Sequence, residues 1–179
     1  MKGIPLPENW YVVYTKPKSE KKLSEYLQRK GVTTFLPLIR TRRKWSDRYK
    51  WIEKPAFDSY LFVRIDYRAQ SLEILRAPQA VNFVHNAGEP AMLRNEEIEI
   101  IRTAVENFSD SLVIHDSSKF SQGQKVIVNF GPFAGKEAIV EKVQGKTLLV
   151  VSFPSLNKSL QVELSVENIR GPAEAVFSS

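Results

Sequence analysis

Residues 122–140 read QGQKVIVNFGPFAGKEAIV, and this stretch decides the fold of the C-terminal third of the chain. Gly123 and Gly135 permit turns that a Cβ would oppose, and Pro132 fixes the approach to an exposed loop. Phe133 stands at the tip of that loop, between a proline and an alanine. An aromatic side chain there either anchors a partner or folds back as a lid on its own domain.

Short strands separated by glycine and proline continue outward from this stretch. We expect strands at 125–129, 137–143, 147–153 and 159–164, with a short turn at 166–169. Such regular spacing is typical of a small all-β barrel, which closes its sheet edges. We therefore predict a barrel domain at 121–171 and a disordered tail at 172–179.

The polar stretch before the barrel marks a domain boundary. Residues 109–111 read SDS and residues 115–119 read HDSSK, which interrupts any periodic pattern. Boundaries fall in such polar segments, so we expect a linker at 109–120 and a first domain at 1–108.

The first domain alternates strand and helix signals. WYVVYT at 10–15 is typical of a buried strand, and Leu23, Tyr26 and Leu27 repeat at helical spacing before a stop at Gly31. The further elements that we expect are a long basic hairpin at 33–57, a strand at 59–65, a helix at 67–76, a strand at 80–84 and a helix capped by Asn95. This order predicts an α+β domain in which helices cover an antiparallel sheet.

Positive charge is concentrated in the first domain. The chain has a formal net charge of +6, and residues 16–54 alone hold 13 basic and 4 acidic side chains, whereas residues 109–179 are neutral. A polyanion is one natural partner for such a segment, and a merely solvated face is the alternative.

The residue inventory argues against catalysis. The chain has no Cys, which excludes disulfides and thiolate zinc sites, and His85 and His115 lack the neighbours of a catalytic triad. GPFAGK does not have the spacing of a phosphate-binding loop. The sequence offers no run of about 20 apolar residues and no secretory signal. We expect a cytoplasmic, monomeric protein that is not an enzyme and needs no cofactor or metal.

Two sets of motifs resemble one family in the same order along the chain. Residues 122–140 resemble the KOW motif, and the first domain resembles the NusG N-terminal (NGN) domain through WYVV at 10–13, FDSYLFV at 57–63 and LRxP at 75–78. The resemblance implies an NGN-type α+β domain followed by an SH3-like KOW barrel. Asp58 and Ser59 depart from the Pro-Gly or Pro-Asn usual before the tyrosine, and Gln79 stands where relatives often have Arg.

The resemblance also implies that the first domain binds the clamp helices of the RNA polymerase β′ subunit through an aromatic depression. Carried over residue by residue, that depression comprises Tyr14, Phe57, Tyr60 and Phe62. Simple core packing is the alternative. Because Tyr60 and Phe62 alternate with Leu61 and Val63, both sets can be buried only if both faces of the sheet are covered.

The resemblance assigns nucleic-acid contacts to basic residues near the first helix. Those that match are Lys16, Lys18, Lys22 and Arg29, and they would touch the non-template DNA strand. Arg42 and Arg43 in the hairpin mix with aromatic residues as in single-strand binders, or the hairpin is only a soluble projection.

These features together predict a transcription elongation or antitermination factor without enzymatic activity. The KOW barrel would recruit a ribosomal small-subunit protein or Rho, with Phe133 as its anchor. The departures and the basic helix favour a specialised paralogue similar to RfaH or UpxY. A ribosome-associated or general RNA-binding KOW protein is the alternative.

Overall fold

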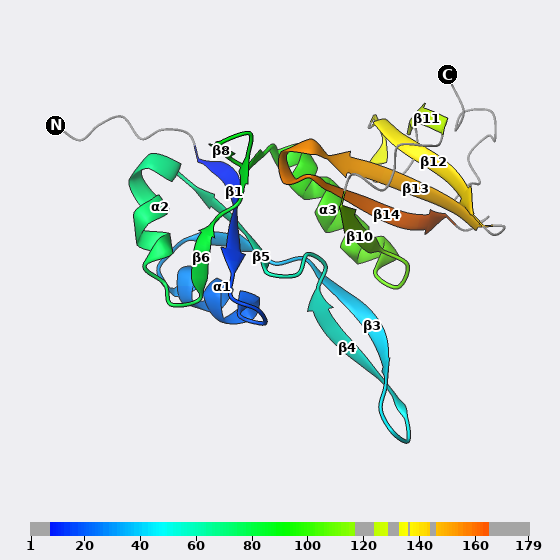
Figure 1. Cartoon of the computed structure of the whole chain (residues 1–179), viewed down its shortest axis with the longest axis horizontal. Coiled ribbons are helices and arrows are strands. Elements are labelled where there is room, and N and C mark those ends of the chain that lie inside the picture. The colour runs from blue at the N-terminus through cyan, green and yellow to red at the C-terminus, as the bar shows by residue number, and fades with distance from the viewer. Residues whose placement is uncertain (1–7, 117–123, 129–132, 136, 144–145, 165–179) are drawn as a thin grey trace.

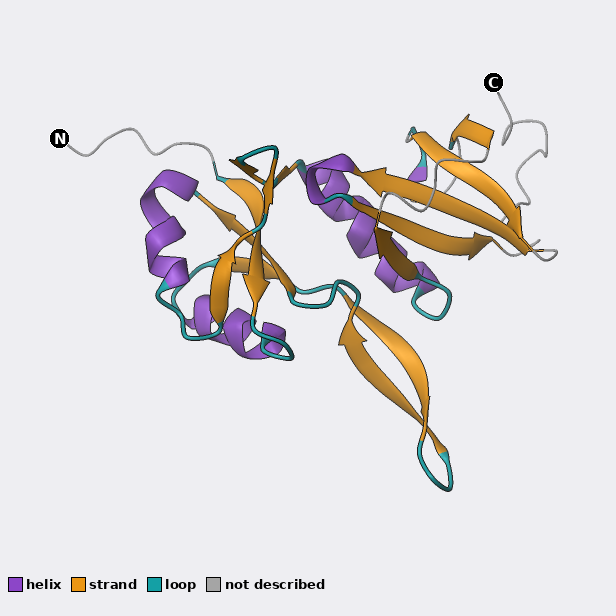
Figure 2. Cartoon of the chain, viewed as in Figure 1, coloured by secondary structure: helices purple, strands orange, loops and turns teal. Residues whose placement is uncertain are grey.

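A computed structural model of the chain describes residues 8–116, 124–128, 133–135, 137–143 and 146–164. An N-terminal α+β domain lies beside a C-terminal β domain, and a long hairpin projects from the first of them (Figures 1 and 2). The fold class expected from the sequence, an α+β domain followed by a small all-β domain, is confirmed.

The main sheet of the N-terminal domain is antiparallel and has β1 at its centre. β1 (Asn9–Thr15) pairs with β5 (Tyr60–Ile65), β6 (Ala80–Phe83) and β9 (Met92–Leu93), while β2 (Thr33–Phe35) pairs with the free side of β5. The strands that the sequence predicted at 10–15 and 59–65 begin within one residue of β1 and β5.

Two helices cover one face of this sheet. They are α1 (Glu20–Arg29) and α2 (Tyr67–Leu75). Val13 and Leu61 of the sheet form a core with Leu23 and Leu27 of α1, and all four side chains are buried. Gly31 has a φ of 80°, which confirms the left-handed stop predicted after α1.

The third helix, α3 (Asn95–Phe108), covers the opposite face and packs on two sides. Ile98 and Ile101 lie in one core with Trp10 and Phe62 of the sheet. Ile100 lies about half a turn away around the helix and lines a hollow with residues of the C-terminal domain. The apolar surface of α3 is therefore wide because the helix lies between two domains (Figure 1).

The N-terminus of α3 differs from the sequence prediction. Asn95 is the first helical residue and does not cap the helix; its side-chain oxygen accepts a hydrogen bond from the Trp10 indole at 3.0 Å. The Glu97 carboxylate instead accepts the backbone N–H of Arg94 at 2.9 Å. Trp10 was expected only as a strand residue, and it also fastens β1 to α3.

The hairpin consists of β3 (Leu38–Lys44) and β4 (Tyr49–Pro55), which form a two-stranded sheet of their own. It extends away from the body of the protein (Figure 2). A second, small hairpin pairs β7 (His85–Asn86) with β8 (Glu89–Pro90).

The C-terminal domain is a five-stranded antiparallel sheet in the order β10-β14-β13-β12-β11. Its strands and its short 3₁₀ helix are β10 (Val113–Asp116), β11 (Gln124–Ile127), β12 (Glu137–Val143), β13 (Lys146–Phe153), η3 (Pro154–Leu156) and β14 (Lys158–Leu164). The edge strand β10 comes from the expected linker at 109–120, because its backbone completes the exposed side of β14. The turn predicted at 166–169 and the tail at 172–179 lie outside the described residues.

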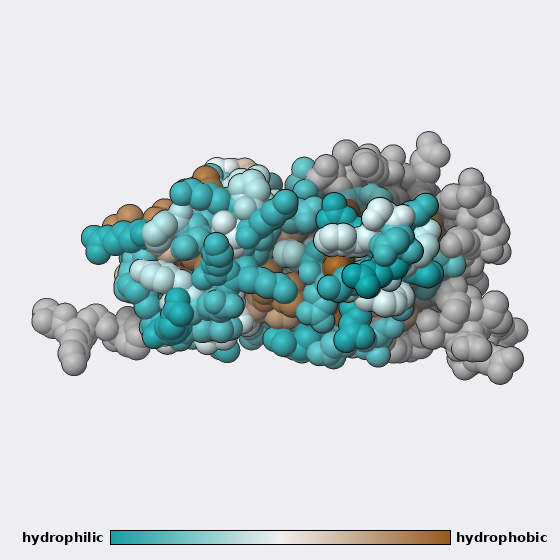
Figure 3. All heavy atoms as spheres, turned by 90° about the horizontal axis from the view of Figure 1, so that it is seen from below, coloured by the Kyte–Doolittle hydropathy of each residue, from teal (hydrophilic) through white to brown (hydrophobic). Residues whose placement is uncertain are grey.

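The two domains share an apolar contact. The rings of Phe108 and Phe133 are 5.7 Å apart, and the Asn86 side chain donates a hydrogen bond to the carbonyl oxygen of Pro154 at 3.1 Å. Seen from below, the surface is mainly hydrophilic, with a small apolar patch near its centre (Figure 3).

Candidate functional site

The four aromatic residues predicted to form one depression do gather at the start of β5. Tyr14 is the direct partner of Tyr60 in the β1–β5 register, and their rings meet edge to face at 6.0 Å. Phe57 lies parallel to Tyr60 at 6.3 Å and touches Phe62 edge to face at 5.4 Å. Such pairs add about 0.5–1.5 kcal/mol each beyond the apolar area that they bury.

Burial divides these four side chains into two pairs. Tyr14 is 41% exposed and Tyr60 is half-buried, whereas Phe57 is 3% exposed and Phe62 is fully buried. The expectation that all four line an open surface is therefore wrong for Phe57 and Phe62. Both lie in the core that α3 covers, and Tyr60 packs against the edge of that core through Phe57.

A buried carboxylate holds the turn before Tyr60. Glu20, in the first turn of α1, accepts the backbone N–H of Ser59 at 2.8 Å, and Thr15 donates its N–H to the Ser59 carbonyl at 2.8 Å. Ser59 has a φ of 62°, a conformation that glycine and asparagine adopt most readily. This explains why Gly or Asn is usual at that position in the pattern that the sequence resembles.

Sequence analysis did not single out Glu20. The signal that could have found it is an acidic residue in the first turn of a helix whose next two residues are lysines, because a carboxylate there can accept backbone N–H groups. Its bond to Ser59 sets the backbone from which Tyr60 begins β5.

The C-terminal domain reaches over this aromatic pair. Lys158, at the start of β14, places its ammonium 5.8 Å from the centre of the Tyr60 ring. Ile114 and Lys158 line a hollow of about 120 Å³ together with Phe57, Asp58 and Tyr60. One side of the Tyr60 surface is thus capped by the second domain.

Phe133 is buried and does not project from a loop tip. Its side chain is 2% exposed and lies against Phe108, at the end of α3. Of the two alternatives that the sequence left open, the structure shows an inward-folded ring, but it packs on the neighbouring domain as well as on its own core. The sequence could not reveal this, because Phe108 belongs to the other domain.

The basic residues predicted around the first helix are all exposed. Lys16 and Lys18 lie in the turn before α1, and Lys22 and Arg29 lie two helical turns apart on its outer surface. The helix itself begins at Glu20. Leu23 and Leu27 of the same helix are buried against the sheet, so the exposed cations lie away from the core.

Arg42 and Arg43 are both exposed, but they lie on opposite faces of the hairpin. Arg42 is directly opposite Trp51, and Arg43 is opposite Lys50. Since neighbouring residues of a strand point to opposite faces, one surface cannot use both side chains. The sequence prediction grouped them, and the structure separates them.

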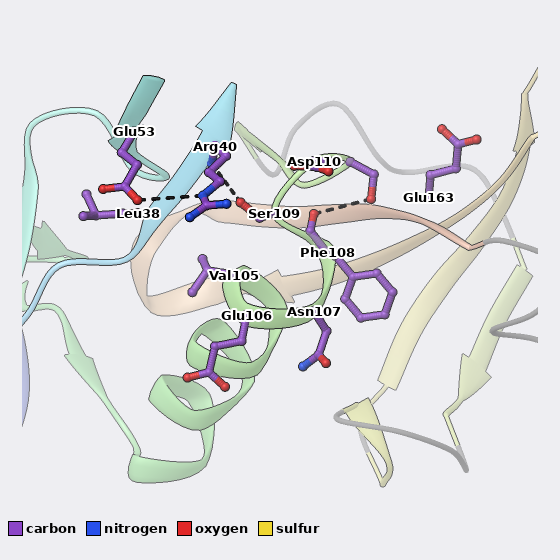
Figure 4. A pocket seen from close by; sticks show the side chains of 11 residues that line it. Leu38, Arg40, Glu53, Val105, Glu106, Asn107, Phe108, Ser109, Asp110 and Glu163 are labelled. Carbon is purple, nitrogen blue, oxygen red and sulfur yellow. Dashed lines mark hydrogen bonds and ion pairs between the residues drawn. The ribbon is translucent and has the colours of Figure 1, made fainter. Parts of the chain in front are cut away.

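The base of the hairpin forms a cleft of about 570 Å³ with the end of α3 and Glu163 of β14 (Figure 4). Ser109 accepts the backbone N–H of Arg40 at 2.7 Å, and the Arg40 guanidinium lies 3.9 Å from Glu53. Acidic side chains line this cleft at Glu53, Glu106 and Asp110, so it does not favour an anion.

Neighbouring groups or burial shift the pKa values of Lys30, Glu73 and Tyr67. The Glu73 carboxylate bonds to the Lys30 ammonium at 2.9 Å, which lowers the pKa of Glu73 and raises that of Lys30. Burial raises the pKa of Tyr67, whose ring packs against Tyr11 and Phe83.

Among the described residues, no group of three or more His, Asp or Glu side chains could hold a metal ion. Within the same described part of the chain, no helix is long and apolar enough to cross a bilayer.

Fold and site together define a two-domain binding protein, with an aromatic pair and a basic helix on its α+β domain. The model of a family described as transcription termination factor nusG matches residues 8–102, and that of the KOW motif matches residues 122–153. The chain therefore belongs to the NusG family, a family of non-enzymatic transcription termination and antitermination factors that work with RNA polymerase.

Curated relatives span nearly the same length. The transcription termination/antitermination protein NusG of Rickettsia felis is 25% identical over 174 residues, covering 91% of this chain and 90% of the relative. That of Chlamydia trachomatis is 26% identical over 155 residues, covering 80% and 84%. A solved structure entitled "Domain interaction in Thermotoga maritima NusG" matches with a TM-score of 0.53 at 19% identity, covering 90% of this chain and 95% of that chain, which supports the fold.

Proposed function

We propose that the N-terminal domain binds the coiled-coil clamp helices of the RNA polymerase β′ subunit through Tyr14 and Tyr60. The observation that carries this proposal is the cross-strand pairing of these two rings at the domain surface, with Phe57 stacked on Tyr60 and Phe62 packed against Phe57. Tyrosines offer a large and rigid contact area, and a supported ring loses little entropy when a helix docks against it.

Binding of the clamp helices competes with the second domain in this proposal. Lys158 and Ile114 occupy one side of the Tyr60 surface, so a coiled coil needs the C-terminal domain to move away. The cost of that movement lowers the apparent affinity for the polymerase. It also exposes Phe133, which then becomes available as the anchor for a ribosomal small-subunit protein or Rho.

Nucleic acid would lie along the outer side of α1 once the polymerase is bound. Lys16, Lys18, Lys22 and Arg29 are exposed there, and lysine and arginine attract phosphates without reading sequence. The proposed ligand is the non-template DNA strand. The role is that of an elongation or antitermination factor, and the basic helix and the capped aromatic pair favour a specialised paralogue.

A clamp-helix binding assay tests the central claim. We expect the full chain to bind an isolated β′ clamp-helix fragment, and Tyr60→Ala to weaken binding at least about tenfold, which corresponds to about 1.4 kcal/mol. Tyr49→Ala is the matched control, because it removes the same side chain from the exposed hairpin. Equal effects of the two changes would contradict the proposed site.

A variant that weakens the contact between the two domains tests whether the C-terminal domain competes with the clamp helices. Phe133→Ala removes the ring that packs on Phe108, so we expect the clamp fragment to bind several-fold more tightly. Weaker binding by this variant would overturn the competition between the domains. Retention on ribosomes or RNA without any clamp affinity would favour the alternative of a general RNA-binding KOW protein.

A further inference from the structure

The outer half of the β3–β4 hairpin exposes large aromatic side chains that neither core uses. Trp45, Tyr49 and Trp51 are each more than half exposed, at 57%, 56% and 58%. The hairpin extends from the body of the molecule, and near its base a hydrogen bond joins the Arg40 backbone to the Ser109 side chain (Figures 2 and 4). Exposed rings at these positions contribute little to folding, so their presence needs another explanation.

The strand register places two of these rings and two cations on one face. Arg42 is directly opposite Trp51, and Lys44 is opposite Tyr49. Opposite residues of an antiparallel pair share a face, and so do residues two apart on one strand. We call the surface formed by Arg42, Lys44, Tyr49 and Trp51 the platform.

Within the platform, the planar guanidinium of Arg42 enlarges the flat surface of Tyr49. The Arg42 guanidinium lies over the Tyr49 ring, 4.2 Å from its centre. Nucleobases stack on guanidinium planes as well as on aromatic rings. Tyr49 and Trp51 are two residues apart on β4, about 7 Å along the strand, so successive nucleotides of an extended strand can each meet a ring.

Charge decides which partner suits the platform. Residues 38–55 carry seven basic and two acidic side chains, and one of the acids, Glu53, faces Arg40 at the base. A neutral protein surface would leave these cations unpaired, whereas each nucleotide supplies both a π-face and a negative phosphate. Unpaired bases are required, because the faces of bases in a duplex are already stacked on their neighbours.

We propose that the platform is a stacking site for single-stranded nucleic acid. Tyr49 and Trp51 stack with successive bases, Arg42 extends the Tyr49 stack, and Lys44 neutralises a phosphate. The site is separate from the Tyr14–Tyr60 surface, and its binding does not depend on the docking of the polymerase.

The opposite face of the hairpin provides a matched control for charge. Arg43 and Lys50 are opposite each other there and are both exposed. Replacing Arg43 and Lys50 by alanine removes the same two charges as replacing Arg42 and Lys44, but leaves the platform intact. All four side chains are exposed, so each double variant is expected to keep its fold, which thermal unfolding verifies.

Fluorescence anisotropy with labelled oligo(dT), oligo(U) and a DNA duplex of the same length tests the proposal on the full chain. We expect at least one of the two single strands to bind more tightly than the duplex. Tyr49→Ala and Trp51→Ala should each weaken that binding about tenfold, whereas Tyr49→Phe should keep it. The stronger of the two single-strand probes identifies the source as the transcript or the separated DNA strand.

Three results would overturn the proposal. They are duplex binding at least as tight as single-strand binding, equal losses from the Arg42/Lys44 and Arg43/Lys50 double variants with no effect of Tyr49→Ala, and no binding of any probe. The first two results define an electrostatic surface without stacking, and the third leaves a protein partner for the hairpin. Failure of the clamp-helix assay would leave all these readouts unchanged.

Discussion

Two aromatic clusters of this chain differ in burial, although both are carried by antiparallel strand pairs. Around Tyr60, the rings of Phe57 and Phe62 are buried because α3 and the C-terminal domain cover that face of the sheet. On the hairpin, Tyr49 and Trp51 are exposed because none of the elements that the structure describes covers its outer half.

This difference shows that the role of an aromatic residue depends on the next layer of structure. A ring in the core contributes to stability through the area it buries, whereas a ring on an uncovered ribbon is free to contribute to binding. Tyr60 lies between these limits, since Phe57 stacks on it and Lys158 caps it from the neighbouring domain. Substitutions on the two clusters should therefore separate stability from binding.

The largest effect is expected at the covered cluster. Phe62→Ala removes a fully buried ring between Phe35 and Phe57, so the free energy of unfolding should fall by about 3–5 kcal/mol. Urea denaturation followed by circular dichroism measures the change. Phe62→Leu should cost much less, and a loss below 1 kcal/mol for the alanine variant would show that this face is not a core.

A smaller effect is expected from the group that positions Tyr60. Glu20→Ala leaves the buried N–H of Ser59 without its acceptor, which should cost about 1–3 kcal/mol. Glu25→Ala on the same helix is the control, because Glu25 is exposed. Equal unfolding midpoints for the two variants would mean that the Glu20 bond does not hold the turn.

Relieving the left-handed backbone conformation of Ser59 should stabilise the turn that Glu20 holds. Ser59→Gly relieves a φ of 62°, so we expect a gain of about 0.5–1 kcal/mol in the free energy of unfolding. The thermal midpoint should rise accordingly. A lower midpoint would indicate that the Ser59 side chain, which is buried, matters more than its backbone conformation.

A still smaller change in stability is expected at the uncovered cluster. Trp51→Ala removes a ring that is more than half exposed, so the free energy of unfolding should change by no more than about 0.5 kcal/mol. Urea denaturation under the conditions used for Phe62→Ala gives the direct comparison. A fall of 2 kcal/mol or more in the free energy of unfolding would show that Trp51 contributes to the core as Phe62 does.

The smallest effect concerns the exposed ion pair between α1 and α2. Lys30 lowers the pKa of Glu73, so the pair stabilises the fold above the ordinary pKa of Glu73 and loses this contribution as the pH falls through the lowered value. Lys30→Gln should return the Glu73 pKa toward its ordinary value, as measured by NMR titration of the carboxyl carbon. An unchanged titration curve would show that the two groups do not interact in solution.

Local patterns were sufficient to predict most of the elements. A dense run of aromatic and β-branched residues predicted β1, alternation predicted β5, and the glycine after the helical repeat predicted the end of α1. Period-2 signals separated by glycine and proline predicted β11 to β14. These features depend on neighbours in the chain, which the sequence displays directly.

The errors concern contacts between distant segments. β10 was interpreted as linker because polar stretches lie on both sides of Val113 and Ile114, and the segment forms a strand only through its pairing with the distant β14. Asn95 was interpreted as a cap, although Trp10 uses its side chain. Phe57 and Phe62 were expected on an open aromatic surface, but α3 covers them. Phe133 was left as either an anchor or an inward-folded ring, and the contact with Phe108 that buries it comes from the other domain.

The sequence by itself determined the order of strands and helices, the two-domain plan and the family, because spacing, turn residues and motifs are properties of the chain alone. Only the tertiary structure decided which aromatic residues remain available, because exposure depends on what packs above each ring. It leaves Tyr14, Tyr49 and Trp51 open and Tyr60 half-covered, and it assigns Phe57, Phe62 and Phe133 to the interior.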